Sequence, residues 1–141
     1  MKKTRTLRIF AVAASLAAVG LFTAGTAVAA GDAAEGEKVY KKRCVACHTL
    51  EEGKNRVGPS LHGIFGRQAG LAPKYKYSKS YVSAGENGLE WTTETLLEYL
   101  ADPKKYMREI TGDKKAKSKM TFKLKKKEDR EHVAAYLESL Q

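Results

Sequence analysis

The sequence predicts a small all-α domain whose terminal helices pack together, with long irregular segments between them. Two observations support this fold class. Apolar residues near the C-terminus recur at helical spacing, and charged residues separate them. The intervals 49–90 and 103–126 show no alternation of apolar and polar residues and are rich in Gly, Lys and Ser. We therefore expect helices at the ends, one between the two intervals, and loops elsewhere.

Residues 1–30 have the plan of a secretory signal peptide. Basic residues at the start are followed by an apolar run from Ile9 and by small residues up to Ala29 and Ala30. We expect cleavage after one of these two alanines, which leaves residues 31–141 as a single exported domain. The alternative is a retained membrane anchor, because the run from Ile9 to Ala30 is uncharged and long enough to span. Its second half is Ala, Gly and Thr, which favours removal.

The first helix of the mature chain is expected over Ala33 to Arg43. Asp32 followed by Glu35 forms a D-x-x-E capping signature just before it. A second helix is expected from Thr93 to Ala101, where three leucines share one face and Pro103 prevents continuation.

The last helix is expected from Lys127 to Gln141. Val133, Tyr136, Leu137 and Leu140 form an apolar stripe at i, i+3, i+4 and i+7 between charged residues. Such a stripe needs a partner, and the first helix is the natural one.

The only two cysteines of the chain, Cys44 and Cys47, are followed at once by His48. A thioredoxin-like pair would need a βαβ scaffold, which the sequence does not suggest. A zinc site needs four ligands, and the chain has one cysteine pair and three histidines in all. The remaining interpretation is C-x-x-C-H, the attachment motif of c-type haem. Thiols at i and i+3 lie on one face of a helical turn, so both can reach the haem vinyl groups. A covalent haem would also give a small, loop-rich domain its apolar nucleus.

A second axial ligand for the iron is sought among the remaining sulfur and imidazole groups. Met107 lies just beyond a helix end and suits the role of a core filler, whereas Met120 lies in the polar stretch KSKMTF and has no obvious core role. His62 leaves a bis-histidine alternative open, although a structural role suits it better. His132 is expected on the surface of the last helix.

Five stretches resemble the class I c-type cytochromes, in particular the bacterial cytochrome c2 group, close to the mitochondrial type. They are GDAAEGEKVYKKRCVACHTL, VGPSLHGIFGRQAG, LEWTTETLLEYLADPKKY, KSKMTF and EHVAAYLESL, in the family's order. The resemblance implies a small cytochrome c fold, with long loops wrapped around one covalently attached haem c. It also implies that Gly36 and Tyr40 on the first helix meet Val133 and Tyr136 on the last.

The resemblance implies roles for further residues. His48 and Met120 would ligate the iron, and the carbonyl of Pro59 would accept the Nδ1 proton of His48. The family residues that bind the haem propionates match Arg67, Tyr77 and Trp91. Polar neighbours of the methionine match Tyr99 and Ser118. Two segments, one around Tyr75 and Tyr77 and one from Met107 to Met120, are longer than the mitochondrial pattern.

Filled axial positions imply an electron carrier rather than an enzyme, with iron cycling between the ferrous and ferric states. The expected partners are a cytochrome bc1-type complex and a cytochrome c oxidase or photosynthetic reaction centre, met in the periplasm by a monomer. The formal net charge is +10, and it falls to +6 when the four basic residues of the leader are removed. A basic surface around the haem edge would steer these encounters. Its lysines are Lys41, Lys42, Lys104, Lys105, Lys117, Lys119, Lys123 and Lys125 to Lys127. No nucleic-acid motif is present.

The alternatives are a small haem enzyme or gas-binding protein with an open iron, and a tethered carrier that keeps its leader.

Overall fold

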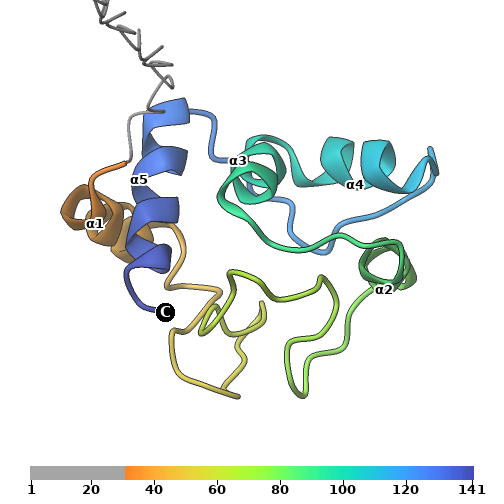
Figure 1. Ribbon diagram of the computed structural model, residues 1–141, viewed down its shortest axis with the longest axis horizontal. Coiled ribbons are helices and arrows are strands. Elements are labelled where there is room, and N and C mark those ends of the chain that lie inside the picture. The colour runs from red at the N-terminus through yellow and green to blue at the C-terminus, as the bar shows by residue number, and fades with distance from the viewer. Residues whose placement is uncertain (1–30) are drawn as a thin grey trace, which may run out of the picture.

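The computed structural model describes residues 31–141, so the expected leader, residues 1–30, lies outside the described residues. The described part of the chain is helical. Its helices are α1 (Ala33–Arg43), α2 (Lys79–Glu86), α3 (Thr93–Ala101), α4 (Pro103–Thr111) and α5 (Lys127–Glu138) (Figure 1). Residues 31–141 contain no strand, only one isolated β-bridge between Gln68 and Glu90. The all-α prediction is therefore confirmed. No helix within this range has the length and apolar character needed to cross a membrane.

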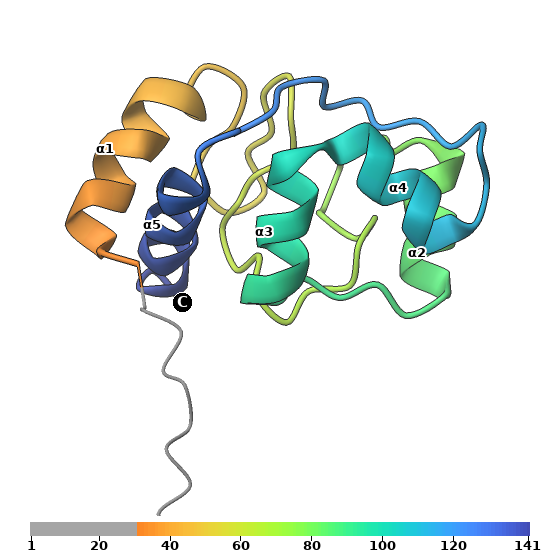
Figure 2. The same cartoon turned by 90° about the horizontal axis from the view of Figure 1, so that it is seen from above.

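The terminal helices α1 and α5 pack side by side at one end of the molecule (Figure 2). A Cβ on Gly36 would lie 2.0 Å from the carbonyl oxygen of His132, so only glycine permits this approach. The rings of Tyr40 and Tyr136 lie 5.8 Å apart between their centroids. Val133 on α5 is 1% exposed. The predicted packing of the first helix against the last is thus confirmed.

The start of α1 differs in one respect from its capping signature. The Asp32 carboxylate accepts from the backbone N–H groups of Ala34 and Glu35, at 2.8 Å and 3.0 Å. The reciprocal bond from Glu35 is not formed, because that carboxylate binds Lys38 at 2.6 Å. The Asp32 N–H donates instead to Nδ1 of His132, 2.8 Å away. The His132 side chain is only 21% exposed, so it belongs to the contact between α1 and α5 rather than to the open surface.

Two helices lie in segments for which the sequence predicts loops, and that prediction is wrong for them. Asp102 caps α4 by accepting from the Lys105 N–H at 3.1 Å. Pro103 opens α4 at a position where its missing N–H is no loss, and Gly112 ends it with φ of 67°. Helix α2 is short, and its apolar face is buried only because other segments cover it.

The remaining chain runs irregularly around the inner faces of the helices. Helix α3 contacts both α5 and α4, and α2 contacts α4 (Figures 1 and 2). Residues 44–78 close the side of the molecule opposite α3 and α4 (Figure 1). The aromatic rings of Trp91, Tyr99 and Tyr106 form part of the buried core. This arrangement leaves a space between the helices and the loops, and most of the predicted site residues border it.

Candidate cofactor-binding site

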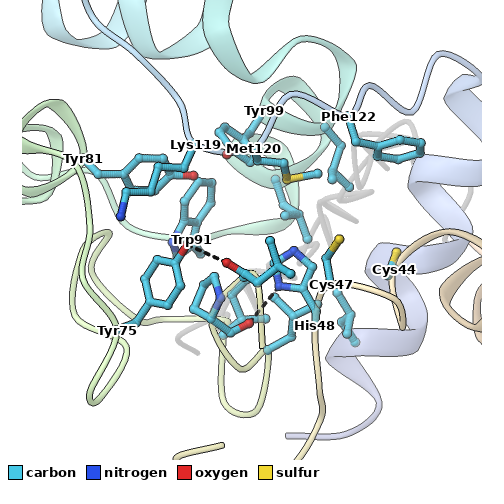
Figure 3. Close-up of a pocket in the computed structure, with 18 of the residues that line it drawn as sticks. Cys44, Cys47, His48, Tyr75, Tyr81, Trp91, Tyr99, Lys119, Met120 and Phe122 are labelled. Atoms are coloured by element: carbon cyan, nitrogen blue, oxygen red, sulfur yellow. Dashed lines mark hydrogen bonds between the residues drawn. The ribbon is translucent and has the colours of Figure 1, made fainter. Parts of the chain in front are cut away.

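A cavity of about 240 Å³ lies between α3, α5 and the loops. Its lining is mostly apolar, with leucine, isoleucine and valine side chains from both helices and loops. These residues are Leu61, Ile64, Leu96, Leu100, Leu124, Val133 and Leu137. All the predicted site residues line the cavity except Ser118. Figure 3 shows His48 and Met120 on opposite sides of this space, with Cys44 and Cys47 at one side.

The two cysteines are presented by a turn that continues from the end of α1. The Cys44 N–H donates to the Tyr40 carbonyl at 2.8 Å, and the N–H groups of Cys47 and His48 donate to the Cys44 carbonyl at 3.0 Å and 2.9 Å. This turn places the two thiols and the imidazole along one wall of the cavity. Both thiols are free. Burial raises the pKa of the Cys44 thiol to about 11, and the neighbouring Cys47 adds a smaller effect in the same direction. Cys44 is therefore an uncharged thiol at neutral pH.

The imidazole of His48 is held in one orientation. Its Nδ1 lies 2.8 Å from the carbonyl oxygen of Pro59. Because a carbonyl can only accept, Nδ1 carries the proton, and the lone pair of Nε2 is left available for a metal. Burial lowers the pKa of His48 while the Pro59 bond acts in the opposite direction. A Cβ on Gly58 would lie 2.3 Å from Cε1 of His48, so the absence of a side chain at Gly58 makes room for the ring.

The thioether of Met120 enters the cavity from the segment between α4 and α5. The Met120 N–H donates to Oγ of Ser118 at 3.2 Å, and the same hydroxyl lies 2.9 Å from the hydroxyl of Tyr99. Burial raises the pKa of Tyr99, so the phenol stays protonated and can hydrogen-bond. Ser118 does not line the cavity and contacts Tyr99 and Met120 through these two bonds. Met107 is 0% exposed within α4 and lies outside the cavity lining.

The other histidines lie away from the cavity. His62 is exposed and is not among the lining residues. Its carbonyl accepts a hydrogen bond from Arg67. His132 contacts Asp32 at the junction of α1 and α5. The structure therefore gives the bis-histidine alternative no second imidazole in the cavity.

The three residues expected near the haem propionates all line the cavity. Arg67 donates to the carbonyl oxygens of His62 and Ser60, at 2.9 Å and 3.1 Å, and burial lowers the pKa of its guanidinium. Trp91 is buried and Tyr77 half-buried. The hydroxyl of Tyr75 donates to the carbonyl of Val57 at 3.0 Å, so it is engaged with the backbone.

Several lining residues are missed by sequence reasoning. Tyr81 is 8% exposed and reaches the cavity from α2, and its spacing from the buried Ala84 is the one signal that could have indicated it. Val57 and Phe122 line the cavity while remaining 78% and 38% exposed, and Lys119 is a third exposed residue of the lining. These three mark the open rim, which only the folded chain brings together.

The donor set fits a haem better than a bare metal ion. Within residues 31–141 no group of three or more His, Cys, Asp or Glu side chains is assembled around one point. The cavity instead offers one imidazole with a free Nε2 and one thioether on opposite sides, two thiols beside the imidazole, and apolar walls. A haem iron takes one or two axial ligands from the protein, and its ring needs an apolar enclosure.

Comparisons with known proteins agree on one family. Residues 33–141 match the family model for cytochrome c. The chain is 50% identical over 130 residues to a cytochrome c2 of Rhodospirillum rubrum, which covers 92% of this chain and 96% of that protein. The solved structure of cytochrome c2 from Rhodospirillum centenum matches with a TM-score of 0.73 and 44% identity, over 78% of this chain and 98% of that one. Ferricytochrome c2 from Rhodopseudomonas palustris matches with a TM-score of 0.71 and 40% identity, over 78% and 99%.

Proposed function

The chain belongs to the cytochrome c family, whose members bind a covalent haem c and carry electrons, and we propose that it is a soluble, monomeric carrier in the periplasm. The proposed donor is a quinol-oxidising cytochrome bc1-type complex. The proposed acceptor is a cytochrome c oxidase or a photosynthetic reaction centre. The periplasmic location rests on the signal-like residues 1–30, and the class of partner on the cytochrome c2 relatives.

In this proposal Cys44 and Cys47 would hold the haem through thioether bonds, and His48 and Met120 would ligate its iron. When bound, the haem supplies a one-electron Fe(II)/Fe(III) couple. Pro59 keeps the proton of His48 on Nδ1, so that the lone pair of Nε2 would be available to the iron. Apolar walls exclude water and keep the environment of the couple constant.

The observation that carries the proposal is the pairing of His48 and Met120 across the cavity. Two protein ligands leave the iron without an open position for a substrate or for oxygen. A thioether ligand also favours the reduced iron and raises its potential relative to two imidazoles. The site therefore supports electron transfer without chemistry on a substrate.

Five further residues are proposed to support the cofactor. Arg67, Tyr77 and Trp91 would donate to the propionates, whose negative charge needs compensation in a half-buried site. Tyr99 and Ser118 would tune the reduction potential from the methionine side of the haem. Their hydroxyls bond each other, and the Ser118 hydroxyl accepts from the backbone N–H of Met120.

The basic surface is proposed as the docking surface. All the lysines named above for it are exposed. Some are neutralised by ion pairs, such as Lys105 with Glu109 and Lys127 with Glu131. Within residues 31–141, the lysines that form no ion pair include Lys42, Lys104, Lys117, Lys119 and Lys125. Lys119 is an exposed residue of the cavity lining, so an acidic partner that contacts it would lie close to the cofactor.

Absorption spectroscopy of the ferric, haem-loaded protein tests the ligand pair. The weak far-red band of methionine bound to ferric iron should be present in the parent and in Met107→Leu, and absent in Met120→Ala. A band that survives in Met120→Ala would overturn the assignment of Met120.

A further inference from the structure

The two segments that are longer than the mitochondrial pattern lie against each other. One contains α2 and the residues just before it, and the other runs from α4 to Met120. Lys117 forms the contact through its backbone: its carbonyl accepts from Oγ of Ser78 and its N–H donates to Oγ of Ser80, both at 3.3 Å. Lys119 adds a bond from its Nζ to the carbonyl of Lys76. Both backbone groups of Lys117 are therefore held by the start of α2.

Ser78 occupies the N-cap of α2 but does not cap it. A serine at this position ordinarily accepts from an N–H in the first turn of its own helix, and here no such side-chain bond is made. The hydroxyl donates across the fold to Lys117 instead, 39 residues further along the chain. Helix α2 therefore lacks the usual N-cap hydrogen bond, and the Ser78 hydroxyl bonds the segment around Lys117 instead.

Lys117 is joined to the methionine through the next residue. Oγ of Ser118 accepts from the N–H of Met120 at 3.2 Å and bonds the Tyr99 hydroxyl at 2.9 Å. Before this point the segment is fixed by Ala116, which is fully buried. Between Ala116 and Met120, the hydroxyls of Ser78 and Ser80 hold the backbone of Lys117. The hydroxyl of Ser118 holds the N–H of Met120 and is itself bonded to Tyr99.

Helix α2 also reaches the methionine side through Tyr81. The Tyr81 ring lies edge-on to Tyr99, with 5.9 Å between the centroids, and 6.2 Å from Trp91. It lines the cavity and is 8% exposed. Tyr99, which bonds Ser118, is thus packed against Tyr81 of α2. The start of the same helix carries the two serines that hold Lys117.

We propose that the start of α2 is a clamp that positions Met120 on the iron, with Ser78 and Ser80 acting through Lys117 and Ser118 and with Tyr81 supporting Tyr99. The inference rests on the proposed ligation by Met120. A loosened segment would let the thioether leave the iron more often. An added ligand would then enter more readily, while the bound fraction of Met120 would fall only slightly.

Imidazole binding to the ferric, haem-loaded protein tests the clamp, because imidazole occupies the iron only after the thioether has left. The double variant Ser78→Ala/Ser80→Ala should bind imidazole roughly fivefold more tightly than the parent, since two neutral hydrogen bonds of modest strength are lost. Ser83→Ala is the matched control on the exposed side of the same helix, and it should bind as the parent does. Ser78→Thr/Ser80→Ala keeps one hydroxyl and should recover part of the difference.

The far-red band and the denaturation midpoint separate the outcomes. A parent without the band would overturn the ligation and the clamp together. A parent with the band, and a double variant that binds imidazole with parental affinity, would overturn the clamp alone. The same holds if the double variant only unfolds more easily, because a purely structural helix would lower the midpoint without changing imidazole affinity.

Discussion

The N–H of Asp32, just before α1, donates to Nδ1 of His132 on α5 across 2.8 Å. A side chain one hundred positions away in the sequence thus completes the N-cap of the first helix. The neighbouring Gly36 lies against the His132 carbonyl, and Tyr40 against Tyr136. One face of α5 therefore fixes both the start and the middle of α1. Because Cys44 follows α1 directly, this junction also sets where the haem-binding turn begins.

Replacing Gly36 with alanine should destabilise the protein. Helix propensity alone would favour alanine by roughly 0.5–1 kcal/mol. The new Cβ would lie 2.0 Å from the carbonyl oxygen of His132, so α1 and α5 must separate. We expect a net loss of about 2 kcal/mol in the free energy of unfolding, measured by denaturant titration of the haem-loaded protein. Glu37→Ala on the same helix removes only a surface ion pair with Lys41, and it should change the free energy of unfolding by less than roughly 0.5 kcal/mol. A more stable Gly36→Ala would contradict the close packing.

The cap of α4 should give a pH-dependent contribution to stability. The Asp102 carboxylate accepts hydrogen bonds from Nζ of Lys123, at 2.5 Å, and from the N–H of Lys105. These bonds lower the pKa of Asp102 below its usual value, and the bond from Lys123 has the larger effect. A carboxyl whose pKa is lower in the folded protein stabilises the fold fully at pH values above its pKa in the unfolded chain. That stabilisation is lost as the pH falls through the pKa of the folded protein.

Thermal unfolding of the haem-loaded protein measures this contribution. Asp102→Ala should lower Tm by roughly 4–8 °C near pH 7, because both the cap and the ion pair are lost. The difference from the parent should stay constant down to about pH 5 and shrink below about pH 4. Asp102→Asn, which keeps a capping oxygen, should lose less. A difference that does not change across this pH range would exclude the ionised carboxylate as its source.

Each cysteine is expected to form one covalent bond to the haem. Cys44→Ser and Cys47→Ser should each keep the haem attached through the remaining thioether, and the double variant should release it. Haem staining after denaturing electrophoresis measures this directly. Retention of haem by the double variant would contradict attachment through these two thiols.

Electron transfer to an isolated oxidase should depend steeply on salt. We expect the second-order rate constant to fall roughly tenfold or more between low and physiological ionic strength. Lys119→Gln should weaken this dependence more than Lys127→Gln, because Lys119 borders the cavity rim and Lys127 is paired with Glu131. Equal salt slopes for the two variants would remove Lys119 from the docking surface.

The sequence predicts the elements whose signals are local. The bounds of α1 and α3 follow from a capping residue and from Pro103, and α5 ends three residues before its predicted end at Gln141. The C-x-x-C-H spacing leads directly to one wall of the cavity. Helix α4 has a local signal too, Asp102 before Pro103, but it is easily taken only as the end of α3.

The remaining features depend on contacts between distant segments. The face of α2 is buried by other parts of the chain, and its serines bond a backbone 37 and 39 residues away. Tyr81 and His132 gain their roles the same way. No short-range pattern encodes such pairings, which is why the sequence predicts a loop at α2 and a surface position for His132.

Carbon monoxide binding to the ferrous, haem-loaded protein tests the central claim most directly, because this ligand needs an open iron position. We predict no binding by the parent at neutral pH and ready binding by Met120→Ala, with the absorption spectrum as the readout. Ready binding by the parent would mean that Met120 does not hold the sixth position. The protein would then be an enzyme or a gas-binding protein rather than an electron carrier.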